Sequence, residues 1–117
     1  MSTINIEFKD HFAIVRLNRP KANAMNMEFV NDLREAFMKL AESENVNGVI
    51  LTSEGKIFSA GLDVVDLYAY DENMINRFWE SFGRMITELV DFPKPLIAAI
   101  NGHSPAGGCV LALCCDH

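Results

Sequence analysis

Two stretches rich in small residues could present backbone N–H groups to a ligand. Residues 58–63 read FSAGLD, and residues 101–109 read NGHSPAGGC. Each follows an apolar run and leads into helical sequence, and the start of a helix has unpaired N–H groups. An N–H after Gly61 and another in the Gly107-Gly108 pair could point at one oxygen atom and form an oxyanion hole, whose donors stabilise developing negative charge. Spacing alone favours the simpler interpretation, that both are tight turns between a strand and a helix.

Few side chains are placed to act as a base or a nucleophile. Glu80 falls on the polar side of a helical pattern, where a solvated carboxylate is expected. His103 is a single histidine in a loop, and such residues more often face solvent or form a hydrogen bond than act in catalysis. Ser59 and Ser104 do not lie in a G-x-S-x-G sequence, and no histidine is placed to activate them. The sequence therefore disfavours a serine hydrolase, and it also has no G-x-x-x-x-G-K-[ST] phosphate loop.

Composition and charge restrict the class of protein. The chain has 117 residues, enough for one domain, and it is 50% hydrophobic and 22% charged, which is typical of a globular protein. Its net charge of -6 argues against a nucleic-acid partner. No apolar run is long enough to span a membrane, and residues 1–7 do not resemble a secretory signal. We therefore expect a cytoplasmic protein.

The three cysteines are expected to be buried and reduced. Cys109, Cys114 and Cys115 lie in one apolar stretch, and an odd number with two adjacent members is a poor disulfide framework. The chain has no CxxC pair that would indicate zinc. We expect no metal site and no separate cofactor.

The elements that would position the two glycine turns alternate between strands and helices. Asn26 and Asp71 are candidate N-caps, because their side chains can accept hydrogen bonds from a first helical turn. Apolar spacing in the second long helix predicts that Trp79 and its apolar neighbours belong to the core. Strands are expected at 4–8, 12–17, 49–51 and 96–100, and helices at 26–43, from 71 to about 90, and from 109. The order β-β-α-β-α-β-α predicts an α/β fold with parallel strand pairing.

Three segments in order resemble the motifs of the crotonase (enoyl-CoA hydratase/isomerase) superfamily. Residues 57–63, IFSAGLD, resemble its F-x-A-G-x-D motif. Residues 95–102, PLIAAING, followed by AGGC at 106–109, resemble its second motif. Residues 18–24, NRPKANA, resemble its opening N-R-P-x-x-x-N-A segment. The resemblance covers the N-terminal half of a family member of typical length, and it implies the N-terminal part of a crotonase-like ββα spiral fold.

The resemblance also implies a substrate and its binding residues. The backbone N–H groups of Leu62 and Gly107 would form the oxyanion hole for the carbonyl of an acyl-CoA thioester. Coenzyme A would then be part of the substrate. Asp63 would be a structural or pocket-wall carboxylate rather than the base. The residues implied to contact the acyl-CoA substrate are Lys21, Ala22, Ala24, Ser59, Ala60, Gly61, Leu62, Asp63 and Gly107.

The residue after the second motif favours one reaction of the superfamily. Family hydratases carry a glutamate directly after the Gly-Gly-Cys sequence, and this chain has Val110 there. The pattern is most similar to mitochondrial-type Δ3,Δ2-enoyl-CoA isomerases, in which one glutamate moves a proton from C2 to C4 or back. That glutamate would lie beyond His117, so we expect the chain to be the N-terminal portion of a longer protein and to be inactive alone.

Other assignments stay open at this level. The same hole could serve a hydratase, hydrolase, decarboxylase or dehalogenase, or the chain could be a non-catalytic fragment that binds acyl-CoA. Family members usually form trimers or dimers of trimers, and the resemblance implies a homo-oligomer here as well.

Overall fold

A sheet of four strands supports two long helices. The structure, a computed structural model, describes residues 2–20, 22–55, 57–100 and 114–116. Strands β1 (Ile4–Lys9) and β2 (Phe12–Leu17) form an antiparallel hairpin. Strands β3 (Gly48–Ser53) and β4 (Leu96–Ala98) each pair in parallel with the preceding strand, so the order is β1-β2-β3-β4. The α/β class and the parallel pairing predicted from the sequence are confirmed.

The register of the sheet places apolar residues in a row that faces the helices. Ile6 of β1 lies opposite Val15 of β2, Val15 lies beside Leu51 of β3, and Leu51 lies beside Ala98 of β4. Val15 and Leu51 are fully buried. The hairpin turn requires a left-handed residue, and Asp10, with φ of 56°, occupies it. Aspartate tolerates this conformation better than most residues, because its short side chain can form local hydrogen bonds.

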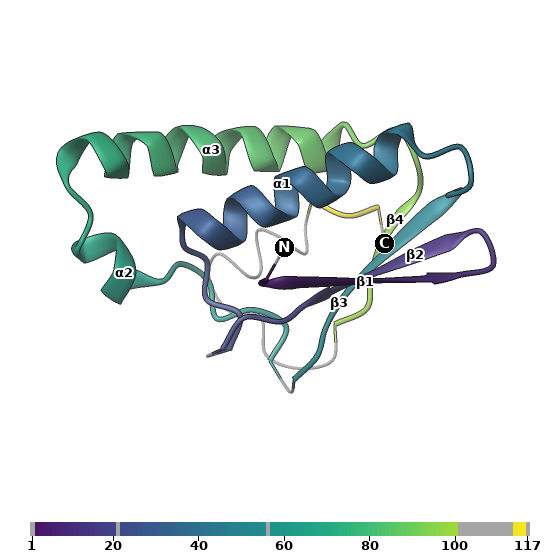
Figure 1. Ribbon diagram of the computed structural model, residues 1–117, viewed down its shortest axis with the longest axis horizontal. Coiled ribbons are helices and arrows are strands. Elements are labelled where there is room, and N and C mark those ends of the chain that lie inside the picture. The colour runs from purple at the N-terminus through teal and green to yellow at the C-terminus, as the bar shows by residue number, and fades with distance from the viewer. Residues whose placement is uncertain (1, 21, 56, 101–113, 117) are drawn as a thin grey trace.

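Helix α1 (Met27–Glu42) lies between the sheet and helix α3 (Glu72–Val90), as Figure 1 shows. Asn26 caps α1, since its Oδ1 accepts the N–H of Phe29 at 2.9 Å. Asp71 caps α3 in the same way through the N–H of Met74, at 2.8 Å. Both N-caps were predicted from the sequence. The residues that α1 buries recur three or four positions apart and are Phe29, Val30, Leu33, Ala36, Phe37 and Leu40.

The C-terminal end of α1 is closed by a side chain from the segment before β4. Lys94 Nζ donates to the carbonyl oxygens of Leu40 and Ser43, at 2.5 and 2.6 Å. A cation is favoured there because the last carbonyls of a helix carry partial negative charge. This contact joins α1 to the entry of β4, so the parallel strand is held in place from the helix layer as well as from the sheet.

Three details differ from the sequence prediction. A short helix, α2 (Val64–Tyr68), precedes α3 and was not predicted, because five residues are too few to show a helical period. Strand β4 ends at Ala98 rather than at residue 100. The assignment of Trp79 to the core is wrong: it is 48% exposed, because α3 packs on α1 through a narrower face that buries only Phe78, Met85 and Leu89.

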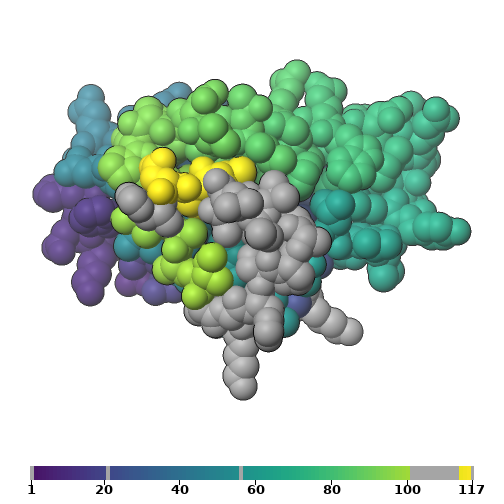
Figure 2. All heavy atoms as spheres, turned by 180° about the vertical axis from the view of Figure 1, so that it is seen from behind, coloured from purple at the N-terminus to yellow at the C-terminus, as the bar shows by residue number. Residues whose placement is uncertain are grey.

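The segment after residue 113 returns to the sheet. Asp116 donates its N–H to Leu96 O at 2.7 Å and accepts the Leu96 N–H on its carboxylate at 2.8 Å. Residues 114–116 form the yellow surface between α3 and β4 in Figure 2. Cys114 and Cys115 are thiols of intermediate burial, whereas full burial was expected. Cys109 and most of the helix predicted from residue 109 lie outside the described residues.

Candidate functional site

The loop after β2 has an unusual backbone conformation. Ala22 and Asn23 both adopt left-handed geometry, with φ of 57° and 54°. Asn23 is only 5% exposed, and its side chain stabilises the loop in three directions. Its Oδ1 accepts the N–H of Arg19 at 2.8 Å, and its Nδ2 donates to Ile57 O at 3.2 Å and Phe58 O at 3.0 Å. The loop is therefore fixed to the segment that follows β3.

The segment after β3 binds back to the same loop. The Ser59 side chain is fully buried, and its Oγ donates to Asn23 O at 2.9 Å and accepts the Gly61 N–H at 3.2 Å. Ala60 donates its N–H to Ala22 O at 2.9 Å. These bonds bring together the two segments implied to contact acyl-CoA, at the ends of β2 and β3 (Figure 1). They also give Ser59 a structural role, in agreement with the sequence argument against a serine nucleophile.

Leu62 lies in a single parallel bridge with Met25. The Met25 N–H donates to Gly61 O at 2.7 Å, and the Asp63 N–H donates to Met25 O at 2.8 Å. In parallel pairing the N–H of the residue between these two groups points to the opposite side. The Leu62 N–H is thus directed away from Met25, and within the described part of the chain it has no hydrogen-bond acceptor. Gly61, with φ of 93°, supplies the turn that leads into this bridge.

A network of charged groups surrounds this bridge. Arg19 Nη1 donates to Ala24 O at 2.8 Å and to Asp63 Oδ2 at 2.7 Å, and Nη2 donates to Asp66 Oδ2 at 3.2 Å. Asn26 Nδ2 also donates to Asp66, at 2.9 Å. The side chains of Arg19 and Asp63 are each 16% exposed, so this ion pair is less screened by solvent than a surface pair.

The charge state of Asp63 follows from its neighbours. Burial opposes its ionisation, but hydrogen bonds from the N–H of Asp66 and from the Arg19 guanidinium, together with the charge of Arg19, more than offset that effect. The pKa of Asp63 is consequently lowered from its ordinary value of 3.8. Asp63 Oδ1 also caps α2 by accepting the Asp66 N–H at 3.1 Å. An ionised carboxylate engaged on both oxygens is a poor base, which agrees with the structural role implied for it.

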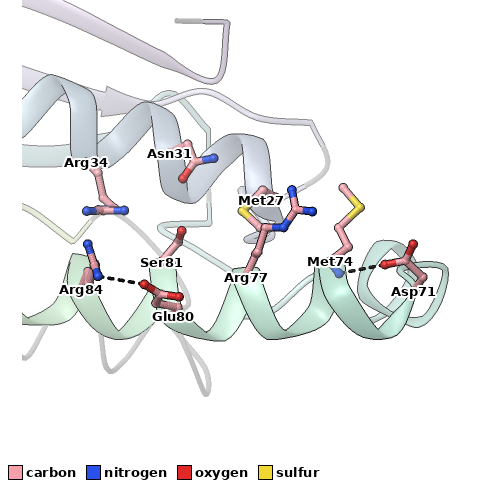
Figure 3. A pocket seen from close by; sticks show the side chains of 9 residues that line it. All are labelled: Met27, Asn31, Arg34, Asp71, Met74, Arg77, Glu80, Ser81 and Arg84. Atoms are coloured by element: carbon pink, nitrogen blue, oxygen red, sulfur yellow. Dashed lines mark hydrogen bonds and ion pairs between the residues drawn. The ribbon is translucent and has the colours of Figure 1, made fainter.

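Besides a smaller cavity of about 340 Å³ beside Phe37, two larger cavities lie at different places on the described surface. One of about 510 Å³ lies at the ends of β2 and β3, and its lining includes Arg19, Ala22 and Asn23. The other, of about 490 Å³, lies between α1 and α3. Figure 3 shows arginine side chains entering it from both helices. The first cavity adjoins the candidate site.

Two of the three arginines that line the cavity between α1 and α3 are paired with glutamates. Arg84 Nη2 pairs with Glu80 at 2.8 Å, and Arg34 Nε pairs with Glu88 at 2.6 Å. The Glu80 side chain is 63% exposed, which confirms that it is a solvated surface carboxylate. We therefore do not assign the described side chains of this cavity a role in acid–base chemistry at the candidate site after β2 and β3.

The structure tests only part of the predicted site. Ala22, Ala24, Ser59, Ala60, Gly61, Leu62 and Asp63 are brought together. Lys21, His103, Ser104, Gly107 and Val110 lie outside the described residues. No role was predicted for Arg19, although it belongs to the N-R-P-x-x-x-N-A segment. Its hydrogen-bond partner Asp63 is 44 residues away in the sequence. No cluster of three or more potential metal ligands occurs in the described parts of the chain, and none of the helices in those parts could cross a membrane.

Comparison with solved structures places the fold in the crotonase class. Human mitochondrial delta3-delta2-enoyl-CoA isomerase superposes with a TM-score of 0.94 at 31% identity, over 98% of this chain and 46% of that chain. An enoyl-CoA hydratase from Bacillus anthracis superposes with a TM-score of 0.90 at 29% identity, over 97% of this chain and 45% of that chain. Residues 7–117 match the sequence profile of enoyl-CoA hydratase/isomerase. The chain belongs to the enoyl-CoA hydratase/isomerase family.

Sequence relatives include both isomerases and hydratases. Mouse mitochondrial enoyl-CoA delta isomerase 1 is 39% identical over 106 residues, which are 90% of this chain and 37% of the relative. A probable enoyl-CoA hydratase of Mycobacterium bovis is 33% identical over 115 residues, which are 97% of this chain and 44% of the relative. The chain thus spans less than half the length of these relatives. The cytoplasmic location and the homo-oligomer stay predictions.

Proposed function

We propose that this chain is the thioester-binding, N-terminal portion of a longer enoyl-CoA isomerase. In this proposal the N–H groups of Leu62 and Gly107 hold the carbonyl oxygen of a 3-enoyl-CoA. A base from the part of the protein after His117 removes a proton from C2 and delivers a proton to C4. The double bond moves from the 3 to the 2 position, and the thioester oxygen carries the negative charge of the dienolate in between.

The observation that carries this proposal is the direction of the Leu62 N–H. Its neighbours Gly61 and Asp63 are both bonded to Met25, so the Leu62 peptide is held rigidly while its own N–H stays available. A donor that is fixed before the substrate binds does not have to reorganise when charge develops on the oxygen. The ends of β2 and β3 also supply a cavity beside Ala22, where the CoA portion of the substrate would lie.

The choice of isomerase over hydratase rests on the sequence. Val110 stands where the family's hydratases have a glutamate, so one of the two carboxylates used to add water is missing. The relative with 39% identity is named an isomerase, and the one with 33% identity is named a hydratase. The other reactions of this hole, and acyl-CoA binding without catalysis, are the alternatives that the following experiment separates.

The decisive assay uses the longer protein with two substrates. Incubation with 3-enoyl-CoA should give the 2-enoyl ester, whereas 2-enoyl-CoA should not be hydrated at a comparable rate. Hydration of 2-enoyl-CoA without isomerisation would overturn the choice of reaction. Acyl-CoA binding without turnover of either ester would favour the non-catalytic alternative.

Two substitutions at one position test the hole itself. Leu62→Pro removes an N–H that forms no bond among the described residues and also fixes φ at position 62 and restricts Gly61, while Leu62→Ala keeps that N–H and shortens the side chain. Loss of one oxyanion donor costs about 10²–10³ in kcat. We expect Leu62→Pro to lose activity on this scale and Leu62→Ala to retain most of it, with folding checked by circular dichroism. Gly107→Pro should abolish turnover in the same way. Full activity in folded Leu62→Pro protein would reject the assignment.

A further inference from the structure

The Arg19 side chain contacts both segments that flank the Leu62–Met25 bridge. Nη1 donates to Ala24 O, one residue before Met25, and to Asp63 Oδ2, one residue after Leu62. One nitrogen atom therefore ties the two strands of the bridge together, at 2.8 and 2.7 Å. The backbone of Arg19 is fixed as well, because its N–H and C=O bond to Asn23 at 2.8 and 2.9 Å.

The second nitrogen extends this clamp to α2. Nη2 donates to Asp66 Oδ2, and the same carboxylate accepts from Asn26, the N-cap of α1. The guanidinium thus bonds the carboxylates of both Asp63 and Asp66 and offsets part of their combined charge. Without it, two carboxylates on the same short segment would repel each other across a partly buried space, and the segment that carries the Leu62 N–H would be free to move.

We infer that Arg19 is a positioning residue that sets the direction of the Leu62 N–H. This inference rests on the proposed function, because it assigns Arg19 a role in orienting one donor of the oxyanion hole. Arg19 also lines the cavity assigned to the CoA portion, so CoA affinity has to be measured separately from kcat. It acts through the hydrogen bonds that hold residues 24–25 against residues 61–63.

The geometry requires arginine rather than any cation. Three acceptors, one carbonyl oxygen from the loop after β2 and two carboxylates from residues 63–66, are satisfied by the fixed, planar fork of the guanidinium. A lysine ammonium is a compact charge on a flexible stem without the planar fork, so it does not hold the three acceptors in one fixed arrangement. Arg19→Lys should therefore keep the fold but not the alignment of the donor, and Arg19→Gln should lose both the charge and the alignment.

The experiment compares these variants in the longer protein with Arg16→Gln as a matched control. Arg16 pairs with Glu7 and Glu54 on the exposed side of β2, away from the bridge. The probe is a 3-oxoacyl-CoA, whose enolate absorbs in the near ultraviolet, and a hole that stabilises the oxygen should raise the enolate fraction above that of the free ester at the same pH. We would also measure the kcat and KM of isomerisation and the affinity for CoA alone. Hydrogen exchange would be followed in the peptide that covers residues 60–66.

We expect Arg19→Lys and Arg19→Gln to bind CoA within about threefold of wild type while kcat falls by at least tenfold. The enolate absorbance at saturating probe should fall in parallel, and amides in residues 60–66 should exchange faster. A role in global stability alone would lower the folded fraction without changing the enolate signal per folded molecule. Arg16→Gln should match wild type in every readout.

Two outcomes would overturn the inference in distinguishable ways. If wild type forms enolate and folded Arg19→Lys protein matches Arg16→Gln in kcat, enolate signal and exchange, Arg19 does not position the donor, and the proposed function stands. If wild type shows neither enolate nor turnover, the proposed function fails, and Arg19 has no hole to position.

Discussion

The side chain of Asn23 is expected to contribute strongly to the stability of the candidate site, although no role in binding or catalysis is assigned to it. Replacing it with alanine removes three side-chain hydrogen bonds, to Arg19, Ile57 and Phe58. Each such bond contributes about 1 kcal/mol net, so their loss costs about 3 kcal/mol. Alanine also pays about 1 kcal/mol more than asparagine to adopt the left-handed conformation at φ of 54°. The expected total loss is about 4 kcal/mol.

Urea denaturation followed by circular dichroism measures this loss. With a denaturant slope of about 2 kcal/mol per molar, the unfolding midpoint of Asn23→Ala should fall by about 2 M. Asn23→Asp keeps the acceptor and the tolerance of left-handed geometry but places a buried carboxylate against the carbonyl oxygens of Ile57 and Phe58, so its midpoint should fall at least as far. Asn18→Ala is the matched control, because Asn18 is an exposed asparagine at the start of the same loop. Its stability should stay within about 0.5 kcal/mol of wild type.

A specific result would refute this reasoning. If Asn23→Ala lowers the midpoint by no more than Asn18→Ala does, the hydrogen bonds of Asn23 do not hold the loop after β2 against the segment after β3. The candidate site would then not be preorganised through Asn23. A large loss of stability with unchanged CoA affinity in the folded fraction would show that Asn23 stabilises the fold without shaping the CoA side of the site.

Three further predictions follow from the same structure. Because the folded state lowers the pKa of Asp63 below 3.8, its ionised form stabilises the fold above that pH, and the contribution is lost as pH falls through the lowered value. The difference in unfolding free energy between wild type and Asp63→Asn should therefore shrink on acidification from about pH 5 to about pH 3, as measured by denaturant titration, and a difference independent of pH would contradict this. Lys94→Met removes two bonds to the last carbonyls of α1 and should destabilise by about 2 kcal/mol in urea titration, whereas Lys39→Met, at a 65% exposed position, should have little effect. Burial, together with the neighbouring Cys114 and Asp116 groups, raises the pKa of Cys115 to about 12. Iodoacetamide at pH 8 should therefore alkylate Cys115 far more slowly in the native protein than in urea, as followed by mass spectrometry of its peptide. Equal alkylation rates in the two conditions would contradict this prediction.

Local features of the structure could be predicted from the sequence because their causes are local. The N-caps Asn26 and Asp71 act within three residues of themselves, and the hairpin of β1 and β2 needs only alternating apolar residues and a tolerant turn. The alternation of strands and helices then fixes parallel pairing of β2, β3 and β4. Helix α2 was missed since five residues show no periodicity, and Trp79 was misplaced because apolar spacing cannot tell how wide the packed face of a helix is.

The candidate site could be predicted from family motifs but not from local sequence patterns. The segments implied by the family motifs meet in the structure, yet the contacts that join them link residues 34 to 47 positions apart and leave no local pattern. Arg19 illustrates this limit. Its spacing to Asp63 is not a motif on its own, and its role depends on two loops that come together only after the sheet has formed.

If the site is built from backbone donors, as proposed, side-chain chemistry is expected to be a poor guide to it. The Leu62 N–H would be the same for almost any residue at that position, so the sequence carries no signal in the donor itself. The signal lies in the residues that hold the peptide: Gly61 with its positive φ, Asn23 with its left-handed geometry, and the Arg19–Asp63 pair. It follows that substitutions of the Leu62 side chain should be milder than substitutions of these supporting residues. Comparing Leu62→Ala with Arg19→Lys in one assay tests that order directly, and a larger loss of kcat in Leu62→Ala would mean that the side chain, not the peptide, does the work at this position.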